Sequence, residues 1–505
     1  MLRTADQAYA ELIRRVKDCS LLASCGSVLG WDERTYMPHR GSAHRGEQMA
    51  LLARLGHEMM TAPEIGQLLA EVEASDLVRD SEGVPAVNVR EIRRTYDRTT
   101  KLPKELVEEL ARTTTRAQQV WQEARAANDF AAFRPWLEKI VRLKRQEAQA
   151  IGYRDVPYDA LLDEYEPGAT TAEISRVFAE LRRELTPLVG AILASGKQAP
   201  RQVLEGDFPV ERQQEFGRAA AAAIGFDFDA GRLDVTTHPF CSGIGPGDCR
   251  ITTRYNPRRF PDAFFGILHE AGHGIYDQGL DPEHFGTPMG SFVSLGIHES
   301  QSRLWENQVG RSRGFWEHFF PKARQTFPEA LGEVSLDQFV FAINDVRPSY
   351  IRVEADETTY NLHIILRFEL EQALLRGDLQ PADVPGAWDE KFEKSFGLKP
   401  PTDALGCLQD IHWSMGGLGY FPTYTLGNLY AAQFMEQARH DLGDLDADFR
   451  RGEFGRLKGW LNEKVHRPGQ RWRAPELCRR ITGRPLSHRP LLDYFQRKYA
   501  PLYGV

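Results

Sequence analysis

The sequence lacks the features that would assign it to a membrane, a secretory pathway or a nucleic acid. No apolar run approaches the ~20 residues that a membrane-spanning helix needs. The first residues include an acid, Asp6, and contain no apolar signal-peptide core. The net charge of −8 argues against nucleic acid as a general partner, because phosphate binding needs a basic surface. We therefore expect a cytoplasmic protein that binds neither membranes nor nucleic acids.

Cysteine is also scarce, with six residues scattered over a chain of 505. This distribution suits a reducing compartment rather than a disulfide scaffold. Cys241 and Cys249 flank a glycine-rich turn and could pair with each other or bind a metal. Because no C-x-x-C spacing is present, two ordinary buried thiols are the simpler interpretation.

Helical periodicity dominates the pattern that is present. It runs from residue 8 to 22, is broken at 31–38, and resumes in segments from 43 to about 150. Two β-branched stretches, at 232–236 and 250–255, are joined by a Gly/Pro-rich connection. We expect a mainly α protein with a small antiparallel β-sheet immediately before the helix described next.

An H-E-x-x-H motif stands at residues 269–273. On a helix, residues i and i+4 share one face, so His269 and His273 can bind one zinc ion. Glu270 can take a proton from metal-activated water without being a ligand itself. Pro261 before the motif and Gly279 after it suit the two ends of a helix. Two ordinary histidines on a helix remain the alternative unless a third ligand exists.

Glu299, 26 residues after the motif, is the candidate third ligand. Catalytic zinc commonly takes two histidines and one carboxylate, which leaves a position for water. Arg303, one helical turn later, could hold a nearby carboxylate in place by charge-assisted hydrogen bonds. The alternative is a surface Glu–Arg pair of the i,i+4 type.

Two later stretches carry candidate substrate-binding groups. A helix expected to open at Ile351 would put Arg352 and Asp356 on one face, either as a structural ion pair or as an arginine held toward a substrate carboxylate. Residues 405–424 form a dense glycine and aromatic cluster. His412 and Tyr420 in that cluster could donate hydrogen bonds to an oxyanion, or could simply pack in the core.

Five separated motifs together resemble the carboxypeptidase Taq family of metallocarboxypeptidases. The resemblance extends from the 31–38 segment to about residue 428, without a departure at the metal or base positions. The motifs that carry it are Asp248-Cys249-Arg250-Ile251-Thr252, the 269–273 motif, residues 298–303, residues 351–356 and residues 406–413.

The resemblance implies a fold, an activity and further site residues. The fold would be an elongated helical molecule with a deep active-site groove, similar to neurolysin and angiotensin-converting enzyme. The chain would be a single peptidase unit, in which residues 1–225 form one groove wall and residues 226–505 form the metal site and the opposite wall. It would work as a homodimer, with Zn²⁺ or with Co²⁺. It would remove single amino acids of broad specificity from peptides with a free C-terminus.

Roles follow from the positions of these motifs. Tyr420, supported by His412, or alternatively Tyr424, would stabilise the oxyanion. Arg352 as the first choice, or Arg250 as the second, would bind the substrate carboxylate. His238 and Gln409 would orient the peptide backbone. Two rivals remain at this point: an endopeptidase or dipeptidyl carboxypeptidase on the same fold, and a non-catalytic peptide-binding scaffold.

Overall fold

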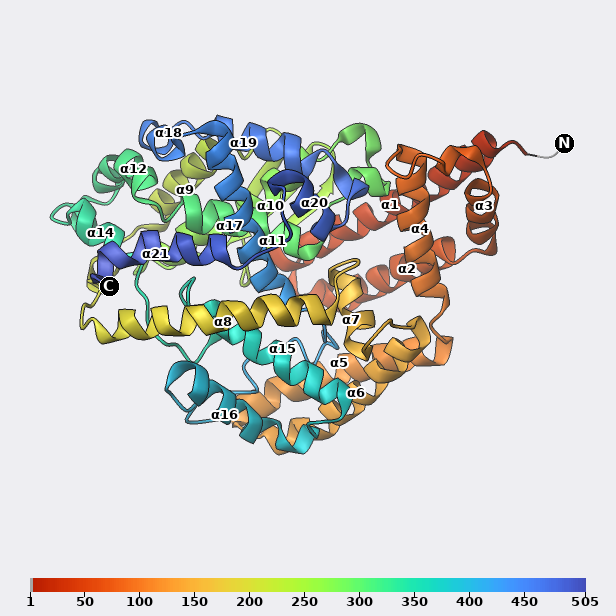
Figure 1. Cartoon of the computed structure of the whole chain (residues 1–505), viewed down its shortest axis with the longest axis horizontal. Helices are drawn as coiled ribbons and strands as arrows, with labels where there is room; N and C mark the ends of the chain where they lie inside the picture. Colours follow the sequence, from red (N-terminus) through yellow and green to blue (C-terminus); the bar gives the residue numbers. More distant parts are fainter. Residues whose placement is uncertain (1–2) are drawn as a thin grey trace.

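The computed structural model describes residues 3–505, in which helices make up almost all of the regular structure. The molecule is elongated, with the first helices at one end and α12–α14 at the other (Figure 1). One large apolar core extends from Ala117 to Tyr503, and a smaller one serves the N-terminal helices. The expected mainly α, elongated architecture is confirmed.

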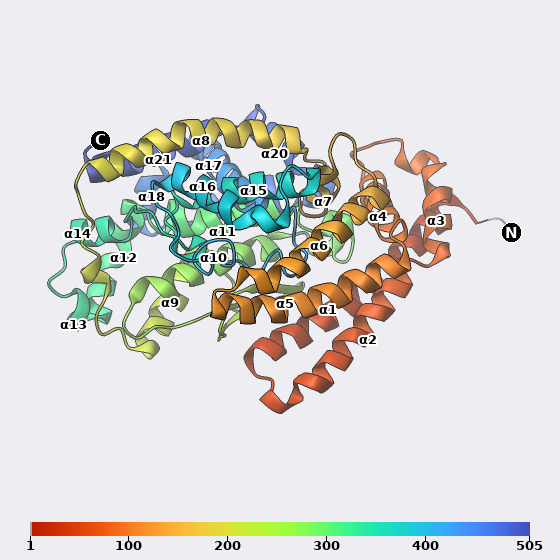
Figure 2. The same ribbon diagram turned by 90° about the horizontal axis from the view of Figure 1, so that it is seen from below.

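The N-terminal helices project from the main body as a separate group (Figure 2). The first helix runs past the break expected at Trp31, because Trp31 is itself buried and the chain turns only before Pro38. Their small core is built by α1, α3 and α4, whereas α2 has no fully buried side chain. The bounds are α1 Ala5–Thr35, α2 Ser42–Met60, α3 Pro63–Glu73 and α4 Val84–Thr100.

The next five helices belong to the main body but not to one side of it: α5 and α6 lie below α8 in Figure 1, and α9 lies above it. An antiparallel hairpin of α5 and α6 turns at Asn128, which adopts a left-handed conformation with φ of 52°. The bounds are α5 Lys104–Ala127, α6 Phe130–Ile151, α7 Pro157–Tyr165, α8 Thr171–Ala194 and α9 Val210–Ile224.

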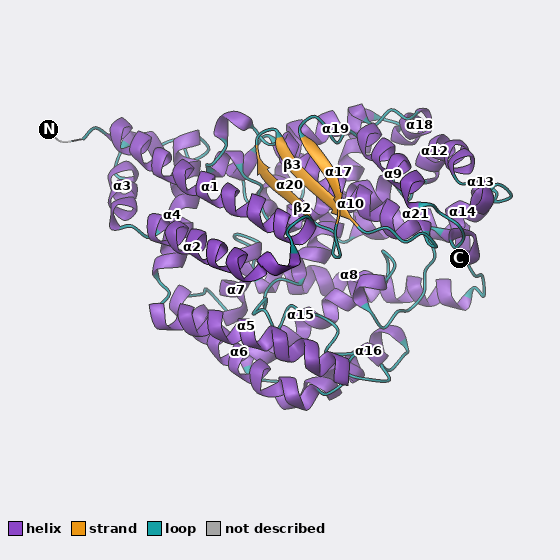
Figure 3. Ribbon diagram, turned by 180° about the vertical axis from the view of Figure 1, so that it is seen from behind, coloured by secondary structure: helices purple, strands orange, loops and turns teal. Residues whose placement is uncertain are grey.

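A three-stranded sheet lies against α10 on the face of the molecule seen in Figure 3. Its strands are β1 Gly231–Val235, β2 Cys241–Gly245 and β3 Asp248–Thr253, in the order β1-β3-β2. The two predicted strands, β1 and β3, are present, but they pair in parallel rather than antiparallel. The reason is the connection, which contains the extra strand β2 that pairs antiparallel with β3. The sheet is therefore mixed.

Three helices pack closely at the centre: α10 Phe260–Gly279, α11 Leu295–Arg303 and α17 Pro422–Leu442. Glycines permit the close approach on both sides of α11. A Cβ at Gly272 would lie 2.6 Å from Ser302 Cα, and one at Gly427 would lie 2.7 Å from Glu299 Cβ. As expected, α10 has Pro261 in its first turn and ends at Gly279.

The remaining helices enclose this centre, and α8 and α21 run side by side along the molecule (Figures 1 and 2). The helix expected from Ile351 begins only at Tyr360, after a single 3₁₀ turn at Arg352–Glu354. None of the helices described in residues 3–505 is long and apolar enough to span a bilayer. The bounds are α12 Arg313–Thr326, α13 Pro328–Leu331, α14 Leu336–Ala342, α15 Tyr360–Arg376, α16 Val384–Phe396, α18 Leu445–Arg451, α19 Gly455–Leu461, α20 Ala474–Thr482 and α21 Arg489–Tyr503.

Candidate metal centre and groove

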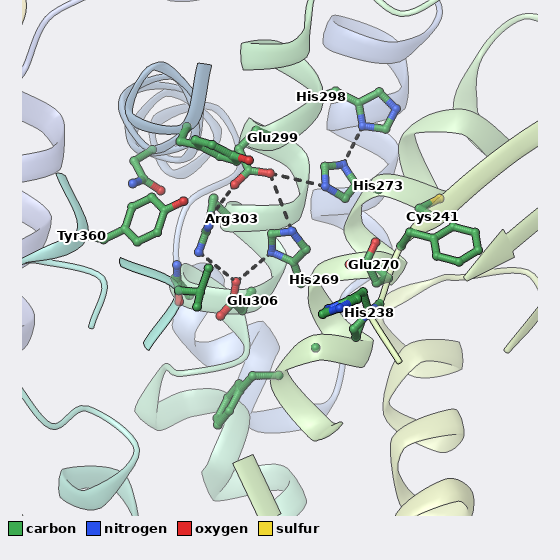
Figure 4. A pocket seen from close by; sticks show the side chains of 18 of the residues that line it. His238, Cys241, His269, Glu270, His273, His298, Glu299, Arg303, Glu306 and Tyr360 are labelled. Carbon is green, nitrogen blue, oxygen red and sulfur yellow. Dashed lines mark hydrogen bonds and ion pairs between the residues drawn. The ribbon is translucent and has the colours of Figure 1, made fainter. Parts of the chain in front are cut away.

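His269 and His273 lie one turn apart on α10, and both turn their Nε2 atoms toward Glu299 on α11 (Figure 4). The Nε2 atoms lie 3.7 Å and 3.4 Å from Glu299 Oε2. One donor atom from each of the three residues falls within 4.8 Å of the other two. Two imidazoles and one carboxylate in this arrangement are a donor set that suits a zinc-type divalent cation.

Glu299 is buried and held in place by its own helix. Arg303 donates from Nε to Glu299 Oε1 at 2.7 Å, and the Ser302 hydroxyl donates to Oε2 at 3.0 Å. Burial opposes ionisation of this carboxyl, but Arg303 and the two imidazoles hold its pKa well below the ordinary value. The Glu–Arg pair is therefore present as a buried pair beside the candidate metal ligands, not as a surface pair.

A set of polar groups behind the histidines fixes which ring nitrogen faces the cluster. His269 Nδ1 lies 2.9 Å from Glu306 Oε2, and so carries the proton that this carboxylate accepts. His273 Nδ1 lies 2.6 Å from His298 Nδ1, and His298 Nε2 lies 3.1 Å from Asp277 Oδ1. Both bonds form at once if His273 donates from Nδ1 and His298 donates from Nε2. Each Nε2 of the pair on α10 is then free to bind a metal.

Sequence reasoning assigned no role to Glu306, His298 or Asp277. Glu306 follows α11 in a π-helical turn, Leu304–Val309, in which Gly310 N donates to Trp305 O at 2.9 Å. Such wide turns are frequent at functional sites. The one available sequence signal was the position of His298 next to Glu299, and no spacing rule indicated its bond to His273.

Burial changes the pKa of two groups at the centre. It lowers the pKa of His273 to about 4, so this imidazole stays neutral, as a metal ligand must be. It raises the pKa of Glu270 to about 7, with the nearby Glu299 and Glu306 adding to the rise and His269 opposing it. A carboxyl with a pKa near neutrality can both take up and release a proton.

The cluster opens into a groove with a volume of about 1850 Å³. Its lining comes from segments far apart in the chain, including Trp121 on α5, the sheet residues 238–249, the helices α10 and α11, residues 342–360, residues 409–424 and Tyr499. The predicted deep groove is thus present, and its size suits an extended peptide. His238 lines it, and Figure 4 shows this side chain near Glu270.

Arg352 lines the groove. The sequence suggested that Asp356 would hold it, but the structure does not show this pair. Because the chain makes only a 3₁₀ turn there and no α-helix passes through residues 352–356, Asp356 instead accepts from the backbone N–H groups of Thr358 and Thr359, just before α15. Arg352 Nε donates to Asp410 Oδ1 at 2.9 Å, and Nη1 donates to the Tyr360 hydroxyl at 2.8 Å. Arg367 pairs with the other oxygen of Asp410 at 2.6 Å. Two guanidinium groups therefore share one carboxylate, which leaves a net positive charge at this part of the groove.

Two predicted substrate-binding residues are committed elsewhere. Arg250 is bound by both oxygens of Asp248, and its guanidinium lies 4.3 Å from the centre of the Trp31 ring. Arg250 is not among the residues that line the groove, because its guanidinium is taken up by Asp248 and Trp31. Gln409 accepts from Arg352 N at 2.8 Å and donates to Tyr350 O at 2.9 Å. Its amide therefore fixes the backbone beside Arg352 and is not free for a peptide.

His412, Tyr420 and Tyr424 gather on the groove wall. His412 Nε2 lies 3.1 Å from the Tyr424 hydroxyl, whereas Tyr420 packs its ring against His412 with centroids 5.2 Å apart. Burial lowers the pKa of His412 to about 4, so the ring is neutral. Of the two tyrosines considered from the sequence, Tyr424 is the one to which the histidine is hydrogen-bonded.

Two histidines of an H-E-x-x-H helix and a carboxylate from a second helix, together at the wall of a peptide-sized groove, are typical of metallopeptidases. A family model described as carboxypeptidase Taq (M32) metallopeptidase matches residues 11–499. The chain belongs to this family and is a metallocarboxypeptidase, which requires a divalent metal ion and acts on peptides.

Individual relatives support the assignment over the whole chain. The chain is 50% identical to thermostable carboxypeptidase 1 of Thermus thermophilus, covering 99% of this chain and 100% of the relative. The crystal structure of an M32 carboxypeptidase from Deinococcus radiodurans R1 superposes with a TM-score of 0.95 at 42% identity, over 99% and 100% of the two chains. A Pyrococcus furiosus carboxypeptidase, described as Apo-Mg, superposes with a TM-score of 0.95 at 35% identity, over 98% and 99%.

Proposed function

We propose that this metallocarboxypeptidase removes single amino acids of broad specificity from the free C-terminus of peptides. The observation that carries the proposal is the position of the His269, His273 and Glu299 donors in one groove with Glu270 and Arg352. The three donors suit a metal ion, Glu270 suits a proton transfer, and Arg352 suits the binding of a carboxylate.

Zn²⁺ is the proposed metal, with Co²⁺ as a possible substitute. Neutral imidazole nitrogens and a carboxylate oxygen match the ligand preferences of both ions, and the bonds to Glu306 and His298 orient the rings for binding. When bound, the cation would polarise the scissile carbonyl and acidify a water molecule.

Glu270 is the proposed general base. Its carboxylate takes the proton from the attacking water and then delivers it to the leaving amine. Because Glu270 follows the first ligand directly and is only 7% exposed, water cannot compete freely for its proton. Its pKa of about 7 suits both halves of this transfer.

Tyr424 is the proposed donor to the oxyanion, ahead of Tyr420. His412 Nδ1 is buried without a hydrogen-bond partner among the described residues. An unpaired buried N–H is rarer than an unpaired acceptor, so the proton belongs on Nε2. Nε2–H then donates to the Tyr424 oxygen and leaves the Tyr424 O–H free to donate to the developing negative charge.

Arg352 is the proposed binding group for the C-terminal carboxylate. Asp410 neutralises only one of its two guanidinium partners, so an anion beside Arg352 would balance the excess charge. Arg352 Nε and Nη2 already contact Asp410, and Nη1 donates to Tyr360, so the second N–H groups of Nη1 and Nη2 are those available to the two oxygens of a carboxylate. His238 remains a candidate for contact with the peptide backbone.

The exopeptidase proposal is tested by digestion of an unmodified peptide and of the same peptide with an amidated C-terminus. Mass spectrometry should show a ladder that shortens by one residue at a time from the free C-terminus, and the amidated peptide should be cut far more slowly. Chelation should stop the reaction, and added Zn²⁺ should restore it. Internal cleavage, release of dipeptides, or equal rates on both peptides would instead support the endopeptidase or dipeptidyl alternatives.

We also propose that the chain acts as one peptidase unit, with residues 1–225 and 226–505 as opposite groove walls, and works as a cytoplasmic homodimer. The continuous core from Ala117 to Tyr503 supports a single unit. The homodimer proposal is supported by α2, which has no fully buried side chain, and by Leu21 on α1 and Leu51 on α2, which are 54% and 48% exposed. The six cysteines are unpaired in residues 3–505, which suits a reducing compartment.

A further inference from the structure

A second group of metal-binding side chains lies beside the catalytic centre, where the sheet meets the end of α10. Cys241 on β2 and Cys249 on β3 face each other with their sulfur atoms 3.6 Å apart. Asp277, in the last turns of α10, places Oδ2 3.8 Å from Cys241 Sγ. One donor atom from each of the three residues lies within 4.8 Å of the other two.

These distances, which two thiols and a carboxylate in contact would also show, are compatible with a metal site. In a tetrahedral zinc site, with bonds of about 2.3 Å to sulfur and about 2.0 Å to oxygen, two sulfur ligands lie about 3.8 Å apart and a sulfur and an oxygen about 3.5 Å apart. The observed spacings lie close to both values, so an ion could bind with little movement of the side chains.

The surrounding backbone leaves room for this cluster. A Cβ at Gly243 would lie 2.5 Å from Asp277 Oδ2, and a Cβ at Gly274 would lie 3.3 Å from Cys249 Sγ. Glycine at position 243 therefore lets the Asp277 carboxylate approach β2, whereas Gly274 accommodates mainly Phe226, whose Cε2 would lie 2.5 Å from its Cβ, and leaves space for the Cys249 thiol as well. All three donor residues also line the groove, which gives an ion a path from solvent.

Only one of the two carboxylate oxygens of Asp277, Oδ2, is available to a metal ion. Its Oδ1 accepts from His298 Nε2 at 3.1 Å, whereas its Oδ2 faces thiols, which are weak hydrogen-bond donors. A cation next to Oδ2 would provide the charge compensation that two neutral thiols do not. Carboxylates that bind a metal are usually also held in place by hydrogen bonds, as His298 holds Asp277.

We propose that Cys241, Cys249 and Asp277 form a second binding site, separate from the catalytic one, for a thiophilic divalent cation such as Zn²⁺ or Cd²⁺. Binding releases one proton from each thiol to solvent, and a water or a groove ligand completes the fourth position. The site is connected to the proposed catalytic ligand His273 through Asp277 and His298, but its binding does not depend on the proposed catalytic roles.

Cd²⁺ is the probe, because its bonds to thiolates give an ultraviolet charge-transfer absorption that imidazole and carboxylate ligands do not. Enzyme is first loaded with one equivalent of Zn²⁺ under reducing conditions and then titrated with Cd²⁺. Wild-type enzyme should develop the absorption, saturate at one thiolate-bound cadmium per chain, and lose two thiols from the count of reactive cysteines. Cys241→Ser and Cys249→Ser should each abolish this absorption, and Asp277→Asn should weaken binding at least about tenfold.

Cys25→Ser is the matched control, because Cys25 is an exposed thiol on α1, and it should behave as the wild type does. Circular dichroism identifies any variant that fails to fold; Cys241→Ser then decides, since Cys241 is the less buried of the two cysteines. Wild-type enzyme without the absorption, or absorption that persists in folded Cys241→Ser, would overturn the proposal. A mass two hydrogens lower in enzyme purified without reductant, mapped to a Cys241–Cys249 disulfide, would also overturn it.

Discussion

Glu270 is buried and directly follows the proposed metal ligand His269, and its replacement should separate chemistry from binding. Glu270→Gln keeps the size of the side chain but cannot accept a proton. We expect kcat to fall by about 10²- to 10⁴-fold while the metal content stays at the wild-type level. Glu354→Gln, the same change at an exposed position in the same groove, should leave kcat within about twofold. Turnover by Glu270→Gln at the wild-type rate would refute its role as the base.

Arg352 offers a second test at a single side chain. Arg352→Lys keeps the positive charge but removes the planar fork, so it should lose a charge-assisted hydrogen bond to the substrate carboxylate. We expect kcat/KM for a free C-terminus to fall by about 10- to 100-fold, mainly through KM. The slow cleavage of an amidated peptide should hardly change. Arg347→Lys, at another groove-lining arginine, is the control and should retain wild-type kinetics.

The residues that could be predicted from the sequence are those whose spacing is itself the signal. His269, Glu270 and His273 lie within about one turn of a single helix, so the local helical geometry alone brings them together. Glu306 and Asp277 meet their partners through the packing of α10 against α11, which no local pattern encodes. Arg352 was paired with the wrong acid because i,i+4 spacing has meaning only inside a helix, and the chain there makes one 3₁₀ turn. Its true partner, Asp410, lies 58 residues away in sequence.

At the level of elements, the contact of α10 with α11 determines whether the three donors can meet. Gly272→Ala would place a methyl group 2.6 Å from Ser302 Cα, so α11 must move and carry Glu299 with it. We expect a loss of stability on the order of 1–3 kcal/mol and a Zn²⁺ affinity at least about tenfold lower. Thermal unfolding and a competitive zinc titration measure the two effects.

Gly266→Ala is the matched control on the same helix. Its Cβ would meet only Thr253 Oγ1, at an ordinary 3.6 Å, and alanine favours a helix by about 1 kcal/mol over glycine. We expect unchanged metal affinity and equal or greater stability. If both variants lost metal equally, the close contact at Gly272 would not be the cause.

Helices were easier to predict than the sheet for a physical reason. An amphipathic helix is recognisable from its own sequence, and the helical segments predicted from residue 43 to about 150 are present as α2 to α6. The direction of strand pairing depends on partners in space. The glycine-rich connection contained β2, which its own composition did not reveal, and this strand converts the expected hairpin into a mixed sheet.

At the scale of the whole molecule, Glu166 links the two halves of the chain. It follows α7, is 1% exposed, and accepts from Gly296 N at the start of α11. Burial raises its pKa from the ordinary 4.5 to about 8. Between these two values the folded state holds a proton that the unfolded state has lost, so the free energy of unfolding falls as the pH rises.

Glu166→Gln removes this titration, and the variant should gain stability relative to the wild type between pH 5 and pH 8. Between these two pH values, the free energy of unfolding of the variant relative to that of the wild type should rise by a few kcal/mol, on the order of 1.4 kcal/mol for each pKa unit. Urea unfolding at several pH values measures it. Glu123→Gln, at an exposed position on α5, should run parallel to the wild type. A difference between Glu166→Gln and the wild type that is the same at every pH would contradict the prediction.

The packing of Gly427 against Glu299 has a consequence for biosynthesis. All three proposed ligands have left the ribosome soon after residue 299 is translated, but α17, which supports Glu299 from behind and ends at Leu442, has not yet been made. At about 5–20 residues per second, the ribosome needs roughly 7–30 s to supply it. We therefore expect the nascent chain to lack a supported metal centre until α17 has been made, so that hydrolytic activity arises only when the polypeptide is nearly complete.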